Sequence, residues 1–136
     1  MNKDVVFEEL NELKNNAYAP YSNFKVSCII YLKNGIKIKG VNVENAAYNP
    51  TICAERNALP QMIAQGYNKD DVEYFALYTD SNKLGSPCGT CRQTMIELLN
   101  KNQSVWIFNK KGFLKEFKVE DFLPFSFSND DLSIKL

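Results

Sequence analysis

The sequence predicts an α/β protein, a three-layer α/β/α sandwich around a mixed five-stranded sheet. Segments with helical spacing of apolar residues alternate with short apolar runs typical of strands, in the order helix, strand, strand, helix, strand, helix, strand, strand. Two turn signals, at Asn34-Gly35 and from Lys110 to Gly112, predict hairpins between consecutive strands. The 136 residues fit one domain without a linker, so we expect a single domain over residues 1–136.

Three segments carry apolar residues at intervals of three and four, the spacing of one helical face. These segments are residues 4–17, 53–65 and 89–101. We expect Asp4 to cap the start of the first helix, and Gly66 lies where a left-handed cap ends the second. Pro60 removes one backbone hydrogen bond inside the second segment, so a short helix that bends there is expected.

Five apolar or alternating runs bounded by turn residues predict the strands. These runs are residues 24–32, 36–41, 72–78, 105–108 and 113–117. Asn34-Gly35 makes the first two strands antiparallel neighbours. In such sheets reactive residues gather beyond the carboxyl ends of strands, where helices begin, and Cys53, Cys88 and Cys91 all fall at predicted helix starts.

The charge pattern limits the kinds of partner. The 16 basic and 16 acidic residues cancel, and no long basic run exists, so neither nucleic acid nor an anionic membrane is an expected partner. Nothing resembles a signal peptide, and no apolar run approaches the roughly 18 residues of a membrane span. We therefore expect a cytoplasmic protein that binds a small, nearly neutral molecule.

The four cysteines and the absence of histidine indicate thiolate chemistry. Cys88 and Cys91 form a C-x-x-C pair that can chelate one ion, and Cys53 can complete a trigonal base, which leaves a fourth position for water. One Zn²⁺ ion is the expected cofactor. A redox motif and a closed structural zinc site are the alternatives, although the remaining Cys28 lies in an apolar strand where a buried core residue is expected.

Glu55 lies two residues beyond Cys53, close enough to handle the proton of a water molecule without binding the metal itself. Because the chain has no histidine, Glu55 is the expected catalytic acid and base. Three thiolates outweigh the charge of one Zn²⁺ ion, so hydrogen-bond donors to sulfur are expected nearby. Arg56 and Arg92 are the candidates, and Arg56 is preferred.

Four segments carry a resemblance to a known family. They are Tyr18-Ala19-Pro20-Tyr21-Ser22, Asn42-Val43-Glu44-Asn45-Ala46-Ala47-Tyr48, Cys53-Ala54-Glu55-Arg56 and Pro87-Cys88-Gly89-Thr90-Cys91-Arg92-Gln93. In this order they closely resemble the small, homotetrameric cytidine deaminases, from about Ala17 to Phe127. The resemblance implies a cytidine deaminase-like catalytic domain with one zinc ion per subunit. It also implies hydrolysis of cytidine and 2′-deoxycytidine to uridine and 2′-deoxyuridine with release of ammonia, as in pyrimidine salvage.

The same resemblance implies the contacts to the nucleoside substrate. Phe24 would pack on the pyrimidine ring, and Asn42 and Glu44 would bind a ribose hydroxyl. Backbone groups of Ala54 and Cys88 would read the base. From the residues alone, Phe24 could equally belong to the core and Asn42 could cap a turn. A neighbouring subunit of a homotetramer with shared active sites would supply Ala46, Tyr48 and Phe127.

Two other functions fit parts of the pattern. A deaminase for a modified cytosine nucleoside such as blasticidin S would share the fold and the zinc motifs, but Asn42, Glu44 and Arg56 favour the ordinary nucleoside. A zinc-stapled, non-catalytic binding module would need a fourth protein ligand.

Overall fold

The computed structural model describes residues 1–136 and contains the mixed five-stranded sheet that the sequence predicts, in the order β2-β1-β3-β4-β5. The strands are β1 (Val26–Leu32), β2 (Lys37–Val41), β3 (Val72–Thr79), β4 (Ser104–Asn109) and β5 (Gly112–Lys118). Only β3 and β4 are parallel, while all other neighbours are antiparallel. The two predicted hairpins are confirmed, with Gly35 and Gly112 at the positive φ angles that these turns require.

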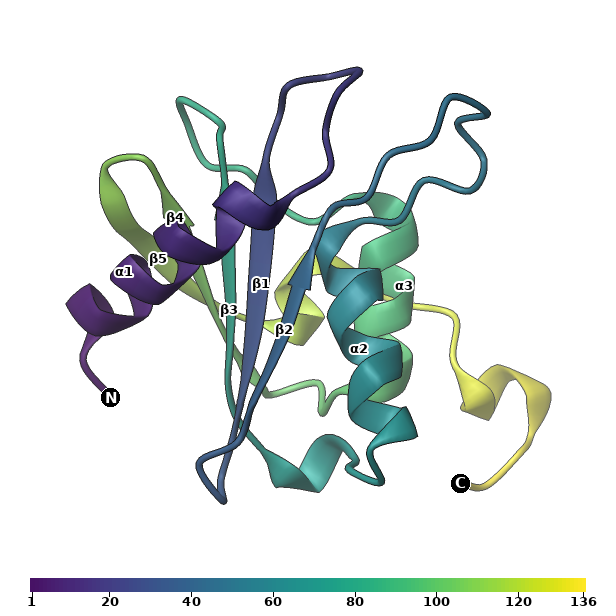
Figure 1. The fold of residues 1–136 in the computed structure, drawn as a ribbon. Helices are drawn as coiled ribbons and strands as arrows, with labels where there is room; N and C mark the ends of the chain where they lie inside the picture. Colours follow the sequence, from purple (N-terminus) through teal and green to yellow (C-terminus); the bar gives the residue numbers. More distant parts are fainter.

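Three helices cover the two faces of the sheet (Figure 1). They are α1 (Lys3–Leu13), α2 (Ala54–Ala64) and α3 (Gly89–Leu98). In Figure 1, α1 crosses one face of the sheet, while α2 and α3 lie together on the other. A cluster of 18 buried residues fills the layer beneath α2 and α3, and a second cluster of eight fills the layer beneath α1. The three-layer α/β/α arrangement is therefore confirmed. None of these helices combines the length and the apolar character that a bilayer crossing demands.

The helix ends differ from the predictions in several places. The first helix ends at Leu13 and a 3-10 turn covers Lys14–Asn16, whereas the spacing predicted a helix as far as residue 17. Asn2, not Asp4, caps α1, because its Oδ1 accepts from the backbone N–H groups of Asp4 at 2.7 Å and Val5 at 3.4 Å. Asp4 lies in the first turn, where its charge suits the helix dipole. The third helix ends at Leu98, three residues before the predicted end.

Helix α2 is held tightly against the edge strand β2. Its backbone runs from Ala54 to Ala64 without interruption at Pro60, and Gly66 adopts the predicted positive φ. Asn57 Oδ1 accepts from the N–H of Val41 at 3.0 Å, so a helix side chain satisfies part of the free strand edge. This docking fixes the start of α2 relative to the sheet.

Three loops gather at one end of the sheet, where α2 and α3 begin (Figure 1). They are the segment before β1, the loop between β2 and α2, and the loop between β3 and α3. Isolated bridges join Val43 to Tyr18 on one side and to Ile52 on the other, so the first two loops form one unit. The Asn34-Gly35 turn lies at the opposite end of the molecule. The loops and the helix starts therefore lie at the same end of the molecule.

Candidate active site and metal centre

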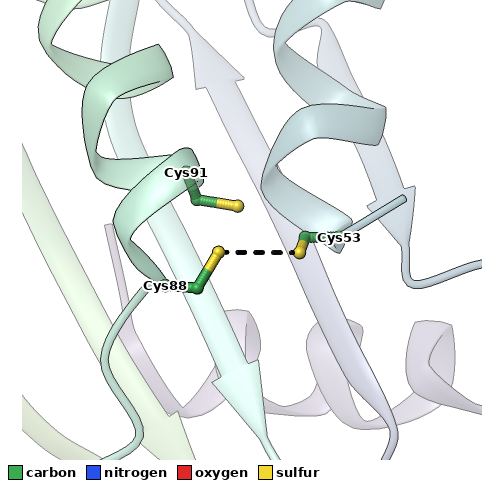
Figure 2. A group of neighbouring side chains, drawn as sticks. All are labelled: Cys53, Cys88 and Cys91. Carbon is green, nitrogen blue, oxygen red and sulfur yellow. Dashed lines mark hydrogen bonds between the residues drawn. The ribbon is translucent and has the colours of Figure 1, made fainter. Parts of the chain in front are cut away.

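The two helix starts carry the three cysteines predicted to bind metal. Cys53 is the N-cap residue of α2 and Cys88 is the N-cap residue of α3, both with extended backbone, and Cys91 lies in the first turn of α3. Free backbone N–H groups and the helix dipole favour negative charge at both places. In Figure 2, Cys53 faces Cys88 and Cys91 across the space between the two helices. The three sulfur atoms lie within 4.8 Å of one another.

The spacing of these sulfur atoms fits zinc. Tetrahedral Zn²⁺ with Zn–S bonds of about 2.3 Å places neighbouring sulfur atoms about 3.8 Å apart. The Sγ atoms of Cys53 and Cys88 are separated by 3.8 Å. Cys91 is buried, whereas Cys53 and Cys88 line a cleft, so one side of the sulfur triangle faces that cleft. Three soft donors with one accessible side describe a catalytic rather than a closed zinc site.

Cys28 is not part of this group. It is fully buried on β1, within the core cluster beneath α2 and α3. The group of possible metal ligands contains Cys53, Cys88 and Cys91 only, so the closed four-cysteine site of a zinc-stapled module is not favoured.

Hydrogen bonds to sulfur determine which thiol ionises first when no metal is bound. A hydrogen bond from the Cys91 thiol and a further one from Arg56 lower the pKa of Cys53 to about 5. The pKa of Cys91 is raised, because its proton is held by the Cys53 thiolate and its thiol is desolvated. Arg56 Nη2 lies 3.8 Å from Cys53 Sγ and also donates to the Thr51 carbonyl at 3.4 Å. Zinc binding requires the remaining protons to leave.

Arg92 does not reach a sulfur atom, in contrast to the expectation from its place beside Cys91. Its Nε donates to the Pro87 carbonyl at 2.7 Å, its Nη1 to the Phe122 carbonyl at 2.8 Å and its Nη2 to Ser86 Oγ at 2.7 Å. The guanidinium group also lies 5.5 Å from the centre of the Phe122 ring. Arg92 therefore braces the turn that leads into the metal site, because its planar fork matches three acceptors at once.

Glu55 is the second residue of α2 and is only 4% exposed. Burial raises the pKa of its carboxyl group to about 7, and the nearby Cys53 thiolate adds to this effect. A bound divalent cation would favour the carboxylate form instead. The side chain lines the same cleft as Cys53 and Cys88. A protonatable group therefore lies at the accessible side of the metal site.

The cleft has a volume of about 310 Å³, the size of a small-molecule site. It brings together most of the predicted site residues, namely Phe24, Asn42, Glu44, Cys53, Ala54, Glu55 and Cys88. Ser22, Thr79 and Ser86 also line it, although no motif in the sequence marked them as site residues. Thr79 directly follows a predicted strand, Ser86 precedes the predicted third helix, and Ser22 ends one of the segments that carry the family resemblance. No lysine or arginine lines the cleft, which suits a ligand without negative charge.

Two polar residues at the mouth of the cleft are held by the backbone. Glu44 accepts hydrogen bonds from the side chain of Ser22 and from the N–H groups of Tyr21 at 3.0 Å and Ser22 at 3.1 Å. The Ser22 hydroxyl is the main cause of its lowered pKa. Asn42 is buried and uses Oδ1 to accept from Val26 N–H at 3.0 Å and Nδ2 to donate to the Phe24 carbonyl at 2.8 Å. Asn42 therefore has a structural role. Its Oδ1 can still accept one further hydrogen bond, and its Nδ2 can still donate one.

Three predicted contact residues do not line the cleft of their own chain. Ala46 and Tyr48 lie on the exposed loop before α2, with Tyr48 78% exposed. Phe127 is 59% exposed, and its carbonyl accepts from Gln93 Nε2 at 2.9 Å. Phe125, two residues before Phe127, is fully exposed at a positive φ. Within one chain none of these residues lines the cleft.

An α/β fold that joins a three-cysteine zinc site to a cleft at two helix starts defines a zinc-dependent enzyme. A sequence model of the family described as "Cytidine and deoxycytidylate deaminase zinc-binding region" matches residues 1–106. The chain belongs to this family, the cytidine and deoxycytidylate deaminases.

Individual relatives cover nearly the whole chain. The cytidine deaminase of Halalkalibacterium halodurans is 36% identical over 98% of this chain and 99% of its own. The cytidine deaminase of Mycoplasma genitalium is 34% identical over 90% and 93%, respectively. Among solved structures, the crystal structure of cytidine deaminase from Burkholderia pseudomallei matches with a TM-score of 0.87 and 37% identity, covering 93% of this chain and 100% of that one.

Proposed function

We propose that this chain hydrolytically deaminates cytidine and 2′-deoxycytidine. Water replaces the 4-amino group, so that cytidine and water give uridine and ammonia. The observation that carries the proposal is the placement of the buried Glu55 carboxyl group beside the zinc-binding sulfurs in one cleft. The family and the relatives named above support the same reaction.

The proton transfers are assigned to Glu55. Bound zinc supplies a Lewis acid that lowers the pKa of a water molecule and makes it nucleophilic at neutral pH. Glu55 takes one proton from the attacking water and delivers it to N3 of the cytosine ring. It then takes the second proton, from the hydroxyl group formed at C4, and delivers it to the amino group, which leaves as ammonia. A group in this role contributes roughly 10²–10⁴-fold to the rate. Burial shields the carboxyl group from bulk water, which keeps each proton within the cleft.

Arg56 tunes the metal site in this proposal. Three thiolates outweigh the charge of Zn²⁺ and would weaken its Lewis acidity. The hydrogen bond from Arg56 to Cys53 draws negative charge away from that sulfur. Arg92 contributes differently, because it holds the Cys88 turn in place.

The remaining residues of the cleft bind the nucleoside. Phe24 packs against the pyrimidine ring, and backbone groups at Ala54, the first residue of α2, read its polar edge. Glu44 stays ionised and accepts a hydrogen bond from a ribose hydroxyl. Asn42 makes its remaining hydrogen bonds to the same sugar. A ligand that lacks the hydroxyl would leave these groups unpaired, which is costly.

The decisive experiment is the Glu55→Gln variant, because the amide is nearly isosteric but cannot carry the proton. We expect the variant to keep its zinc and its Tm while turnover of cytidine falls by about 10² or more. Conversion to uridine is followed by absorbance and by ammonia release. Glu8→Gln, on the exposed face of α1, is the matched control and should retain wild-type turnover. A zinc-loaded Glu55→Gln protein with normal turnover would exclude the assigned role.

We further propose a homotetramer with shared active sites, in which Ala46, Tyr48 and Phe127 contact the substrate of a neighbouring subunit. All three are exposed and none lines the cleft of its own chain, which supports this arrangement. Mixing inactive Glu55→Gln chains with Phe127→Ala chains tests it, because a hybrid contains sites with an intact Glu55 and an intact neighbouring Phe127. Activity that rises on subunit exchange supports shared sites. Strictly additive activities, or a monomer by light scattering, contradict them.

The proposed biological role is pyrimidine salvage by one catalytic domain, residues 1–136, in the cytoplasm. A site built from three thiolates needs a reducing compartment, which supports this location. Localisation of a tagged protein by cell fractionation tests this part of the proposal.

A further inference from the structure

We infer that Asp80 is a positioning residue, which holds the segment carrying Phe24 against the cleft. This inference rests on the proposed function, since it concerns how the nucleoside is bound. Asp80 is the first residue after β3, and it lies outside both the metal ligands and the cleft lining.

Asp80 binds both backbone groups of Lys25, the residue that follows Phe24. Its Oδ2 accepts from the Lys25 N–H at 3.0 Å, and its own N–H donates to the Lys25 carbonyl at 3.1 Å. This pair continues the antiparallel pairing of β1 with β3 by one residue beyond the strand ends. A carboxylate acceptor makes this a stronger hydrogen bond than a neutral group would.

Asn42 completes the clamp from the other side. It accepts from the Val26 N–H and donates to the Phe24 carbonyl through its side chain, and its own N–H donates to the Val26 carbonyl at 3.3 Å. The N–H of Phe24 itself donates to Ser22 Oγ at 3.0 Å. Every backbone N–H and carbonyl from Phe24 to Val26 is therefore hydrogen-bonded. The backbone that carries the Phe24 ring is thus held in one position.

The carboxylate of Asp80 is itself held on its far side. Tyr78 donates its hydroxyl proton to Asp80 Oδ1 at 3.0 Å, and Lys14 Nζ lies 3.7 Å from the same oxygen. Lys14 also donates to the Tyr78 hydroxyl at 2.9 Å. Lys14 follows α1, so this network links the opposite layer of the sandwich to the cleft. The ion pair is partly solvated and adds little, whereas the hydrogen bond to Lys25 sets the position of the segment.

The clamp predicts an effect on binding rather than on chemistry. Phe24 contacts the pyrimidine ring equally in the bound substrate and in the transition state. Its misplacement therefore weakens the binding of both to the same extent, which raises KM and leaves kcat unchanged. We expect Asp80→Ala to raise KM for cytidine and Kd for uridine about tenfold, with kcat within about threefold and zinc content unchanged. Asp80→Asn should restore both constants to within about threefold, because its amide oxygen can still accept from Lys25.

Lys14→Met removes the ion pair but keeps the clamp, and is the matched control, with KM and Kd unchanged. Amide hydrogen exchange at Lys25 provides a readout that needs no turnover. It should accelerate at least about tenfold in Asp80→Ala and stay slow in the Lys14→Met protein.

A Lys25 amide that remains protected in Asp80→Ala overturns the inference, as does a fall in kcat at constant KM. Lack of rescue by Asp80→Asn overturns it too, because the hydrogen bond would then not be the cause. A wild-type protein that binds uridine without deaminating cytidine rejects the proposed function, while the exchange and Kd comparisons still decide the role of Asp80.

Discussion

Replacing Gly40 by alanine is expected to push α2 away from β2 and to displace the metal-binding end of that helix. A Cβ atom at this position would lie 2.5 Å from the Ala54 carbonyl oxygen and 2.8 Å from the Ala58 nitrogen. Ordinary contacts begin at 3.4 Å, so the start of α2 must retreat by about 0.9 Å. Both obstacles are backbone atoms of α2, which cannot rotate aside. The shift therefore reaches Cys53 and Glu55, which flank Ala54.

The expected magnitudes follow from this displacement. Overpacking of a core costs about 1–3 kcal/mol, which lowers the Tm of a chain of this size by about 3–15 °C. A displacement near 1 Å at the reacting groups lowers kcat/KM by about 10²-fold. Calorimetry gives the Tm of the zinc-loaded protein, and the uridine assay gives kcat/KM. Gly89→Ala is the stability control, because a Cβ there meets nothing within 4 Å. A Gly40→Ala protein with unchanged Tm and full activity would refute the argument.

Three further predictions concern the metal site and the surface. Arg92→Ala frees the Cys88 turn and should weaken zinc binding about 10–100-fold in competition with a chromogenic chelator; Arg92→Lys, which lacks the planar fork, should rescue little. Removal of zinc by a chelator should lower the Tm of the protein. The difference in Tm between the zinc-loaded and the chelated protein should grow with the zinc concentration of the zinc-loaded sample, and a Tm that does not depend on zinc contradicts this prediction. Burial raises the pKa of Glu9, but hydrogen bonds from Lys37 and Tyr31 outweigh it and lower the pKa overall. Because the pKa is lower in the folded protein, ionised Glu9 stabilises the fold at pH values above its pKa in the unfolded chain, about 4.3, and this stabilisation is lost as pH falls through the folded pKa. At pH 7 the Tm of Glu9→Gln should therefore lie about 1–4 °C below that of the wild type, and this difference should shrink below about pH 4. A Tm difference that does not change with pH rejects the argument.

Much of the fold could be predicted because its signals are local. Asn34-Gly35 and Gly66 specify turn and cap conformations by their own backbone preferences, and the structure confirms both. The Cys88 and Cys91 pair was recognisable because a single turn brings both sulfurs to one side. Cys53 was recognisable because it begins the other helix.

The features that escaped prediction depend on contacts between distant parts of the chain. Asp80 lies 55 positions from Lys25, and nothing local marks their pairing. The three acceptors of Arg92 include Phe122, which belongs to a segment 30 residues away. Gly40 resembles any glycine in a strand until α2 is docked over it. The assignment of Phe127 stays a prediction, because it depends on a neighbouring subunit.

The N-cap positions of α2 and α3 are both occupied by cysteines whose side chains make no capping hydrogen bond. Serine, threonine or aspartate would normally satisfy the free N–H groups there. One ion bound by Cys53 and Cys88 joins the N-termini of α2 and α3. Binding of that ion therefore stabilises both helix starts, in place of two separate capping side chains. Starved of zinc, the protein is expected to keep its sheet and α1 while both helix starts fray together. Metal supply would then control the formation of the cleft as well as the chemistry within it.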